Sequence, residues 1–187
     1  CFAEMQLAAV TGQQLDLLAN AADVAKVYEL KTGSYTVRGP LRMGALMAGA
    51  PTRVLNALDR FALPVGIAYQ LRDDLLSVFG DPKTTGKPFG SDLRAGKNTV
   101  VLLTALKRAR GRDHRVLKAA VGNSRATVTE LKQAVEVIER SGARAAVEGR
   151  IDELVGSALA ALRAGRLPPN GIELLEGAAR VLTLRRN

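Results

Sequence analysis

The sequence predicts an all-α protein on three observations. Apolar residues make up 47% of the 187 residues and aromatic residues only 4%, with alanine and leucine dominating. This mixture favours helices over sheets. Apolar positions recur at helical spacing through most of the chain. The one short run that would suit a strand, Val100–Leu103, has no second strand with which to pair.

The N-terminal part of the sequence predicts two helices joined nearly end to end. Residues 3–31 have apolar positions at helical spacing, with a break expected near Gly12. Gly33 is expected to end or kink this helix. Residues 34–50 then continue in helix and carry several small residues that would let another helix approach closely.

The middle of the sequence predicts two helices, a long loop and a further helix. Pro51 opens an amphipathic helix over residues 52–61, and Pro64 opens the next one. Residues 81–98 are rich in glycine, proline and charge, and a loop of this length in a compact domain is usually functional or disordered. Because Phe89 and Leu93 give this loop apolar side chains to bury, we expect an ordered flap over the site. Helix resumes over 99–110.

Three helices are expected to close the chain, over residues 127–140, 143–164 and 170–185. Gly142 and Gly165 stand where a helix commonly needs a left-handed cap. The pair Pro168 and Pro169 predicts a stiff turn, and Asn170 after it is a typical helix cap. No internal repeat or linker is evident, so residues 1–187 are expected to form a single all-helical domain.

Two neighbouring aspartates on the helix that follows Pro64 are the strongest functional signal. At 3.6 residues per turn, Gln70, Asp73 and Ser77 fall on one stripe of the helix, while Asp74 lies about 100° away. An aspartate pair alone is more often a solvated helix end. Here, however, the pair lies among Ala68, Leu71, Leu75, Leu76 and Val78, which argues against a freely solvated face.

Two lysines in the glycine-rich loop that follows complete this signal. Lys87 and Lys97 stand among glycines at 86, 90 and 96. Magnesium prefers oxygen ligands and is usually completed by substrate phosphates, which lysines meet as point charges. The sequence therefore predicts a magnesium and diphosphate site that includes Asp73 and Asp74.

The region from Gly66 to Lys97 resembles the second aspartate-rich region of trans-isoprenyl diphosphate synthases, the polyprenyl synthetase family. The resemblance extends to Gly12-Gln13-Gln14-Leu15-Asp16-Leu17 and to Lys31-Thr32-Gly33, and it covers nearly the whole chain. It implies an antiparallel helical bundle around a central cavity, the isoprenoid synthase type. The family's first aspartate-rich motif is not in these residues, so the chain resembles roughly the C-terminal half of a synthase.

The resemblance implies a magnesium-dependent prenyltransferase that joins isopentenyl diphosphate to an allylic diphosphate, giving farnesyl or geranylgeranyl diphosphate. In this family Lys31 would bind the allylic diphosphate, and Thr32 and Gln70 would face the developing cation. Lys87 and Lys97 would hold the departing diphosphate, and Asp73 with Asp74 would hold Mg²⁺. A homodimer is also implied.

Three further residues are expected to have lesser roles. A break at Gly33 would free the carbonyls of the preceding turn, whose partial negative charge could stabilise an allylic cation. Asp92 is expected to order the loop rather than to bind metal. Asp16 is expected either to take part in helix packing or to hold a ligand-binding residue in place without contacting the ligand.

Ser77 keeps two alternative functions open. It stands where the family usually has a third aspartate, and a hydroxyl is a weaker, neutral ligand. Together with the absent first motif, it would suit a non-catalytic subunit of a heteromeric synthase. Asp73, Ser77 and Asp81 also resemble the metal triad of class I terpene cyclases, although Gly80 and Pro82 are expected to end the helix near Asp81.

The net charge of +9 raises nucleic-acid binding as a third alternative. Basic residues cluster between Lys107 and Lys118, but no aromatic residue interleaves with them and the chain has no tryptophan. The chain therefore offers few aromatic side chains on which nucleic-acid bases could stack. We therefore expect a solvated connection between helices in this region, and no nucleic-acid partner.

The remaining composition excludes several other classes of site. Cys1 is the only cysteine and His114 the only histidine, so an intramolecular disulfide, a thiolate metal cluster and a nucleophilic triad are not expected. No run of about twenty apolar residues could span a bilayer. No charged-then-apolar signal pattern opens the chain, and a cytoplasmic protein is expected.

Overall fold

All regular elements among the described residues are helical in this computed structural model, which describes residues 1–18, 20–86 and 88–184. The predicted all-α class is confirmed. The chain divides into two compact units. The first comprises Cys1–Gln70 and the described residues from Arg150 onward, and the second comprises Leu71–Gly149.

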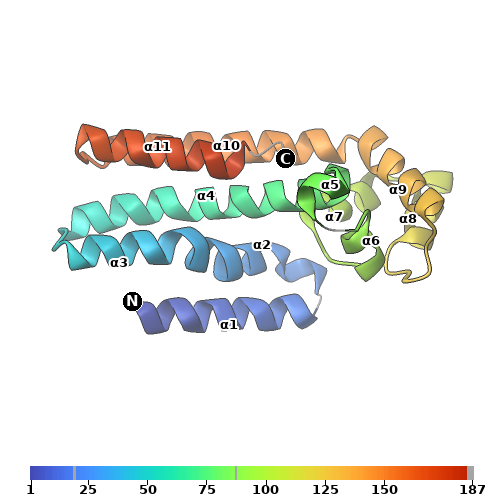
Figure 1. Cartoon of the computed structure of the whole chain (residues 1–187), viewed down its shortest axis with the longest axis horizontal. Helices are drawn as coiled ribbons and strands as arrows, with labels where there is room; N and C mark the ends of the chain where they lie inside the picture. The colour runs from blue at the N-terminus through green and yellow to red at the C-terminus, as the bar shows by residue number, and fades with distance from the viewer. Residues whose placement is uncertain (19, 87, 185–187) are drawn as a thin grey trace. The chain divides into compact units, whose positions relative to one another are not determined.

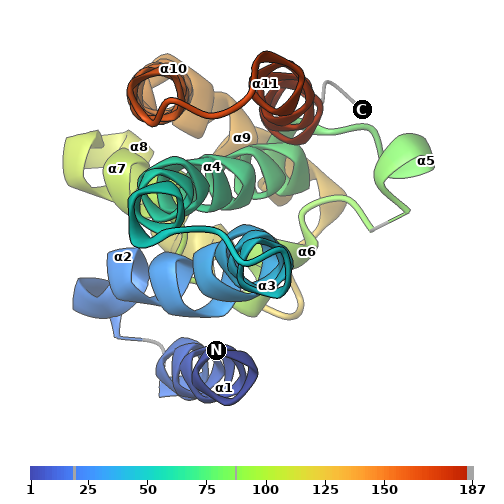
Figure 2. The same ribbon diagram turned by 90° about the vertical axis from the view of Figure 1, so that its left-hand side faces the viewer.

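The first unit is built from long helices that run back and forth. They are α1 (Phe2–Leu18), the short η1 (Ala21–Asp23) and α2 (Val24–Val27), the π-helix η2 (Tyr28–Arg38), α3 (Gly39–Met47), most of α4 (Thr52–Phe79), most of α10 (Ala143–Ala164) and α11 (Pro169–Thr183). Figures 1 and 2 show α1 against the α2–η2–α3 row, this row against α4, and α4 against α10 and α11. The row of η2 and α3 therefore lies between α1 and α4.

The core of this unit lies on the face of α4 that meets α10 and α11. Phe61, Val65 and Leu162 are almost fully buried there, together with Ala158 and Ala179. The sequence predicted separate helices on either side of Pro64, but α4 is one helix with Pro64 inside it. Proline removes one helical hydrogen bond, and we attribute the continuity of α4 to the burial of Phe61 and Val65 on either side of it.

Two glycines that were expected to interrupt helices instead lie inside them. Helix α1 runs unbroken through Gly12 and ends at Leu18, and Gly33 lies inside η2, which continues directly into α3. The predicted break near Gly12 was therefore wrong, and Gly33 does not end a helix. A Cβ atom added to Gly12 would lie 2.5 Å from the backbone nitrogen of Lys31. Gly12 is needed for close packing of α1 on η2, not for a turn.

Gly33 has the same role on the opposite face of η2. A Cβ atom added to Gly66 of α4 would lie 2.5 Å from the Cα atom of Gly33. Real Cβ atoms do not approach other atoms so closely, because van der Waals repulsion rises steeply there. These two glycines therefore let η2 and α4 touch backbone to backbone.

The second unit contains the remaining helices. They are α5 (Pro82–Thr85), α6 (Ser91–Ala95), α7 (Val100–Arg108), α8 (Gly111–Ala120) and α9 (Val128–Arg140), with the adjoining ends of α4 and α10. The basic run was expected to be a solvated connection, but α8 occupies most of it. Its residue Asp113 pairs with Arg140 of α9 at 2.6 Å, which fastens the two helices together.

The predicted ordered loop after α4 contains α5 and α6 and is tied down at its second half. Leu93 is only 2% exposed, and its carbonyl accepts a hydrogen bond from the backbone of Gly122 at 2.9 Å. The guanidinium of Arg94 donates to the carbonyl of Ala126. The burial expected for Leu93 is thus confirmed.

The caps expected near the C-terminal end are confirmed in part. Gly142 has a left-handed backbone, as predicted, but Gly165 does not, and the left-handed residue there is Arg166. Gly165 is instead packed against Ala57, whose Cβ would lie 2.5 Å from an added Cβ. Helix α11 begins at Pro169 with Pro168, rather than Asn170, as its cap.

The described part of the chain contains no helix that combines the length and the hydrophobicity needed to cross a membrane.

Replacing Gly66 by alanine tests the backbone contact between η2 and α4. We expect Gly66→Ala to lower the free energy of unfolding by about 1–3 kcal/mol, the usual cost of overpacking, measured by urea denaturation followed by circular dichroism. The matched control is Gly149→Ala in α10, where an added Cβ meets nothing within 4 Å. The control should raise stability by about 1 kcal/mol, since alanine favours helix. Equal effects of the two substitutions would contradict the contact.

Candidate active site

The Lys31-Thr32 element lies inside an unusual helix. The π-helix η2 is 11 residues long, whereas π-turns are rare, mostly single, and frequent at functional sites. Thr32 is only 7% exposed. The carbonyls expected to be freed by a break at Gly33 lie within a continuous helix, and that of Leu30 accepts a hydrogen bond from the hydroxyl of Ser34. The expectation of freed carbonyls was therefore wrong.

Thr32 and Gln70, which are 38 positions apart in sequence, meet in the structure. The hydroxyl of Thr32 donates to the Oε1 atom of Gln70 at 2.7 Å, and the pair is partly buried. Gly33 follows Thr32 directly, and Gly66 lies one helical turn before Gln70, so the contact between the glycines brings the two side chains within reach. The hydrogen bond therefore fixes the carbonyl end of the Gln70 amide next to the hydroxyl of Thr32.

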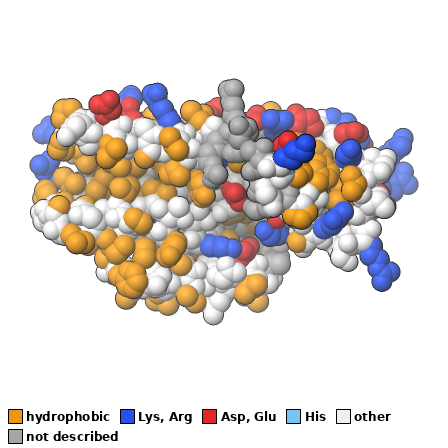
Figure 3. All heavy atoms as spheres, in the orientation of Figure 1, with side chains coloured by type: hydrophobic (Ala, Val, Ile, Leu, Met, Phe, Trp, Pro, Cys, Tyr) orange, Lys and Arg blue, Asp and Glu red, His pale blue; other side chains and the backbone are white. Residues whose placement is uncertain are grey.

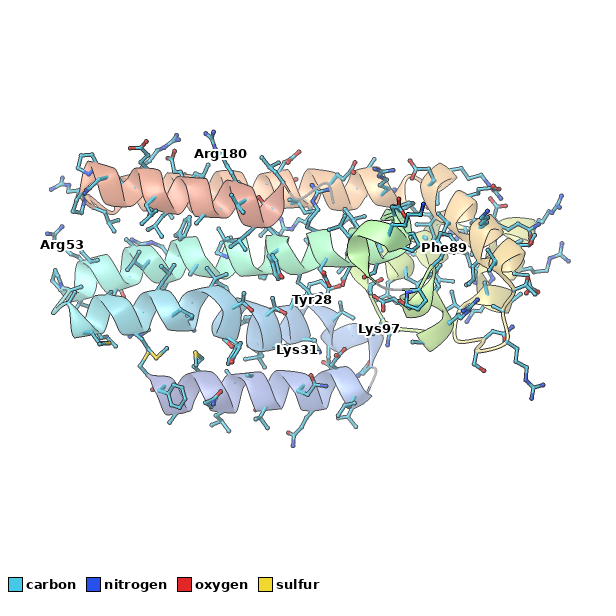
Figure 4. The ribbon with its side chains drawn as sticks, in the orientation of Figure 1. Tyr28, Lys31, Arg53, Phe89, Lys97 and Arg180 are labelled. Atoms are coloured by element: carbon cyan, nitrogen blue, oxygen red, sulfur yellow. The ribbon has the colours of Figure 1, made fainter. Side chains whose placement is uncertain are left out.

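Lys31 is held by α1. Its ammonium group lies 2.6 Å from a carboxylate oxygen of Asp16, and the two side chains are 38% and 40% exposed. Figure 4 labels Lys31 on η2, on the side toward α1. Exposed ion pairs contribute at most about 1 kcal/mol. An anion with more charge than a carboxylate could therefore replace Asp16 as the partner of Lys31.

The role of the Gly12 to Asp16 segment is thus more direct than sequence reasoning indicated. Gly12 contacts the backbone of Lys31, and Asp16, one turn later on the same helix, contacts its side chain. The separation of four residues in α1 could have signalled this, because it places both residues on one face of the helix.

The two aspartates of α4 have different surroundings. Asp74 is only 5% exposed, while Asp73 is partly exposed. Because of its greater exposure, Asp73 is the more accessible carboxylate of the pair. The hydroxyl of Ser77 donates its proton to the backbone carbonyl of Asp73 at 3.0 Å, within the helix.

Asp73 and Asp74 fit a magnesium ion that is bound partly by protein carboxylates and partly by the oxygens of a diphosphate. Among the described residues, no three or more histidine, cysteine, aspartate or glutamate side chains are grouped so as to hold a metal on their own. Mg²⁺ bound with substrate phosphates usually takes only one or two carboxylates from protein and keeps several waters. Asp73 meets that smaller requirement, with Asp74 next to it in the chain.

Lys97 belongs to the second unit and has its own carboxylate partner. Its ammonium group lies 2.9 Å from Asp92, which is almost buried, and its backbone nitrogen donates to the carbonyl of Asp92 at 3.1 Å. Figure 4 labels Lys97 and Phe89 in this segment. Asp92 thus orders the loop around Lys97, as expected. Lys87 lies outside the described residues.

The predicted site residues are therefore divided between the two units. Lys31, Thr32 and Gln70 belong to the first unit, where Thr32 and Gln70 are in direct contact. Asp73, Asp74 and Lys97 belong to the second. Helix α4 carries Gln70, Asp73 and Asp74 as one continuous element.

Comparison with known protein families shows to which family the chain belongs. Residues 1–138 match the family model described as polyprenyl synthetase. The chain belongs to the polyprenyl synthetase family. Among curated relatives, the geranylfarnesyl diphosphate synthase of Aeropyrum pernix is 37% identical over 145 residues, which cover 74% of this chain and 44% of that protein. The farnesyl diphosphate synthase of Escherichia coli is 41% identical over 105 residues, 53% of this chain and 35% of that protein.

Solved structures of the family confirm the predicted fold type. A geranylgeranyl pyrophosphate synthase from Corynebacterium glutamicum, complexed with isoprenyl diphosphate and magnesium, is 36% identical with a TM-score of 0.93. The alignment covers 99% of this chain and 54% of that one. A polyprenyl synthase from Caulobacter crescentus, complexed with calcium and isoprenyl diphosphate, is 30% identical with a TM-score of 0.89, covering 100% and 58%. The chain thus spans about half the length of such family members.

Two substitutions at Thr32 test its contact with Gln70. We expect Thr32→Val, which keeps the shape but removes the hydroxyl, to lower the free energy of unfolding by about 1 kcal/mol, the usual net contribution of a hydrogen bond. Thr32→Ser keeps the donor and should retain more of that stability after allowance for its lost methyl group. Urea denaturation of the three proteins measures the difference. A serine variant less stable than the valine variant would contradict the hydrogen bond.

Proposed function

We propose that the chain contributes to the condensation of isopentenyl diphosphate with an allylic diphosphate, giving a longer trans-prenyl diphosphate such as farnesyl or geranylgeranyl diphosphate. The contact between Thr32 and Gln70, directly beside Lys31, is the observation that carries this proposal. It places two uncharged oxygen-bearing side chains next to a cationic one. A reaction in which an allylic diphosphate separates into a cation and an anion needs both kinds of group.

The lysines are proposed to bind the diphosphate. Lys31 is partly exposed and pairs with the carboxylate of Asp16, so a diphosphate can compete with this carboxylate for it. Lys97 is proposed to act in the same way, with Asp92 holding its loop. Lys87 is included on the family resemblance. Ammonium groups stabilise the negative charge that accumulates on a leaving diphosphate.

Thr32 and Gln70 are proposed to face the allylic cation. The Oε1 atom of Gln70 accepts from Thr32, and an amide oxygen carries partial negative charge that favours a nearby cation. Neutral oxygens stabilise a cation by their dipoles without forming a covalent bond to it. The restricted exposure of Thr32 also helps to keep water away from such a cation.

Asp73 is proposed to hold Mg²⁺, with Asp74 in support. The ion, when bound, would neutralise charge on the diphosphate and so make it a better leaving group. The magnesium in the Corynebacterium glutamicum structure supports this proposal. The homodimer implied by the family resemblance is also kept as a proposal.

A second candidate function is that of a non-catalytic subunit in a heteromeric synthase. One observation favours it: Ser77 stands at the position where the family resemblance leads one to expect a third aspartate.

Incubation with substrates tests the proposed reaction. The chain is mixed with isopentenyl diphosphate, an allylic diphosphate and Mg²⁺, and products are sought by mass spectrometry. An elongated prenyl diphosphate, from the chain alone or after the unmatched region of a relative is supplied, would support catalysis, and its length would give the substrate class. No product under either condition would contradict catalysis and favour the non-catalytic subunit.

Substitutions on α4 test the metal assignment independently of turnover. We expect Asp73→Ala to abolish the magnesium-dependent binding of inorganic diphosphate, measured by isothermal titration calorimetry. Ser77→Asp should leave this binding intact or strengthen it, because a carboxylate is a better ligand than a hydroxyl. Asp152→Ala, an exposed aspartate of α10, is the control and should bind as the parent does. If Asp73→Ala also binds as the parent does, the metal assignment is wrong.

A further inference from the structure

Positive charge is concentrated in one stretch of the second unit. Residues 99–127 contain seven lysine and arginine residues and a single acidic residue, Asp113, so the formal charge of this stretch is +6, against +9 for the whole chain. Helix α8 lies in the middle of the stretch. Most of the excess positive charge of the chain is therefore carried by α8 and the residues next to it.

Three of these cations form a stripe on the outer face of α8. Arg112, Arg115 and Lys118 follow one another at intervals of three residues, which places neighbours about 60° apart around a helix. All three are exposed, whereas Leu117 and Ala120 on the opposite face are almost fully buried. Packing thus orients α8 so that the stripe faces solvent. Figure 3 shows Lys and Arg side chains projecting from this part of the surface.

The one carboxylate of the stretch is paired with another helix. Both carboxylate oxygens of Asp113 accept hydrogen bonds from the guanidinium of Arg140 on α9, at 3.0 and 2.6 Å. In the described part of the chain, no ion pair joins Arg115 or Lys118 to a carboxylate. Positive charge is therefore in excess on the outer face of α8, which suits an anionic partner.

The composition of this face favours a lipid surface over a nucleic acid. Residues 99–127 contain no aromatic side chain on which a base could stack. Beside its cations the exposed face of α8 has Gly111 and Ala119, and the helix contains no asparagine or glutamine to read the edge of a base. Clusters of about four to eight lysines and arginines on an amphipathic helix are typical of proteins that bind anionic lipid headgroups.

We propose that the outer face of α8, with Arg112, Arg115 and Lys118, binds the surface of an anionic lipid bilayer. The contact is electrostatic and peripheral, because the apolar face of α8 stays packed inside the protein. A prenyl diphosphate has an apolar chain that favours a bilayer over water, so the contact would hold the chain where such a product collects, a consequence that rests on the proposed function. The binding itself involves neither Mg²⁺ nor turnover, so the two proposals can fail separately.

Cosedimentation with lipid vesicles tests the proposal. Vesicles made from equal parts of phosphatidylcholine and phosphatidylglycerol should bind the chain at about 0.1 M salt, whereas vesicles of phosphatidylcholine alone should not. Binding should be lost at about 1 M salt, because screening shortens the range of charge interactions from about 10 Å to about 3 Å. The triple variant Arg112→Gln, Arg115→Gln and Lys118→Gln should bind about a hundredfold more weakly, at roughly fivefold for each cation. Glutamine is a good helix former.

Two control variants separate the stripe from net charge. Arg53→Gln, Arg60→Gln and Arg180→Gln together remove the same charge from exposed positions of the first unit. This variant should bind within about threefold of the parent, because charges outside the contact are screened over about 10 Å. Arg112→Lys with Arg115→Lys keeps the charge of the stripe and should bind as the parent does.

Four results would overturn the proposal. They are no binding of the parent to the anionic vesicles, equal binding to both kinds of vesicle, equal loss of binding in the α8 triple variant and the first-unit triple variant, or displacement of the chain from the anionic vesicles by duplex DNA at about 0.15 M salt. The last result would assign the stripe to a nucleic acid.

Amine labelling of the parent chain tests the location without any substitution. An amine-reactive reagent is applied with and without the anionic vesicles, and the modification of each lysine is measured by mass spectrometry. Modification of Lys118 should fall several-fold with the vesicles, whereas that of Lys26 in α2, which is also exposed, should not change. Equal protection of the two lysines would contradict binding through α8.

Discussion

The backbone contact between Gly33 and Gly66 is the constraint on which the candidate site depends. A side chain at Gly66 would collide with the backbone of Gly33 and push η2 away from α4, and the hydroxyl of Thr32 could then no longer reach Gln70. The same approach places the π-helix against the one helix that continues to Asp73 and Asp74. Neither glycine has a left-handed backbone, so both are needed for the absence of a side chain and not for unusual dihedral angles.

Helix α1 supports the opposite face of η2 by the same means. Gly12 admits the backbone of Lys31, and Asp16 pairs with its ammonium group. The π-helix is thus packed closely on both faces exactly where the Lys31-Thr32 element lies. We infer that this two-sided packing holds an otherwise uncommon helix in place, because a π-helix has little stability of its own. A carboxylate partner also keeps Lys31 oriented, as Asp92 does for Lys97, until a more highly charged anion arrives.

Much of the fold was predictable from the sequence, because apolar periodicity reports which face of a helix is buried. Periodicity predicted α7 and α9 nearly to the residue, and the acidic and basic residues proposed for the site came from their types and spacing and from the family resemblance. The roles of Gly12, Gly33 and Gly165 were not predictable in this way. In a sequence, a glycine inside a helical pattern indicates a helix break. The contacts of these three glycines, with Lys31, Gly66 and Ala57 respectively, exist only after folding. Pro64 was misread for a related reason, because the burial of Phe61 and Val65 on either side of it exists only after folding.

The central claim is that Lys31, Thr32 and Gln70 of the first unit bind an allylic diphosphate, and amide hydrogen exchange tests it most directly. The chain is compared with and without Mg²⁺ and an allylic diphosphate. The account predicts slower exchange in two separate segments of the first unit, residues 28–34 of η2 and residues 66–70 of α4, and only when both the ion and the diphosphate are present. Slower exchange in neither segment at saturating ligand, or in regions that exclude both, would contradict it.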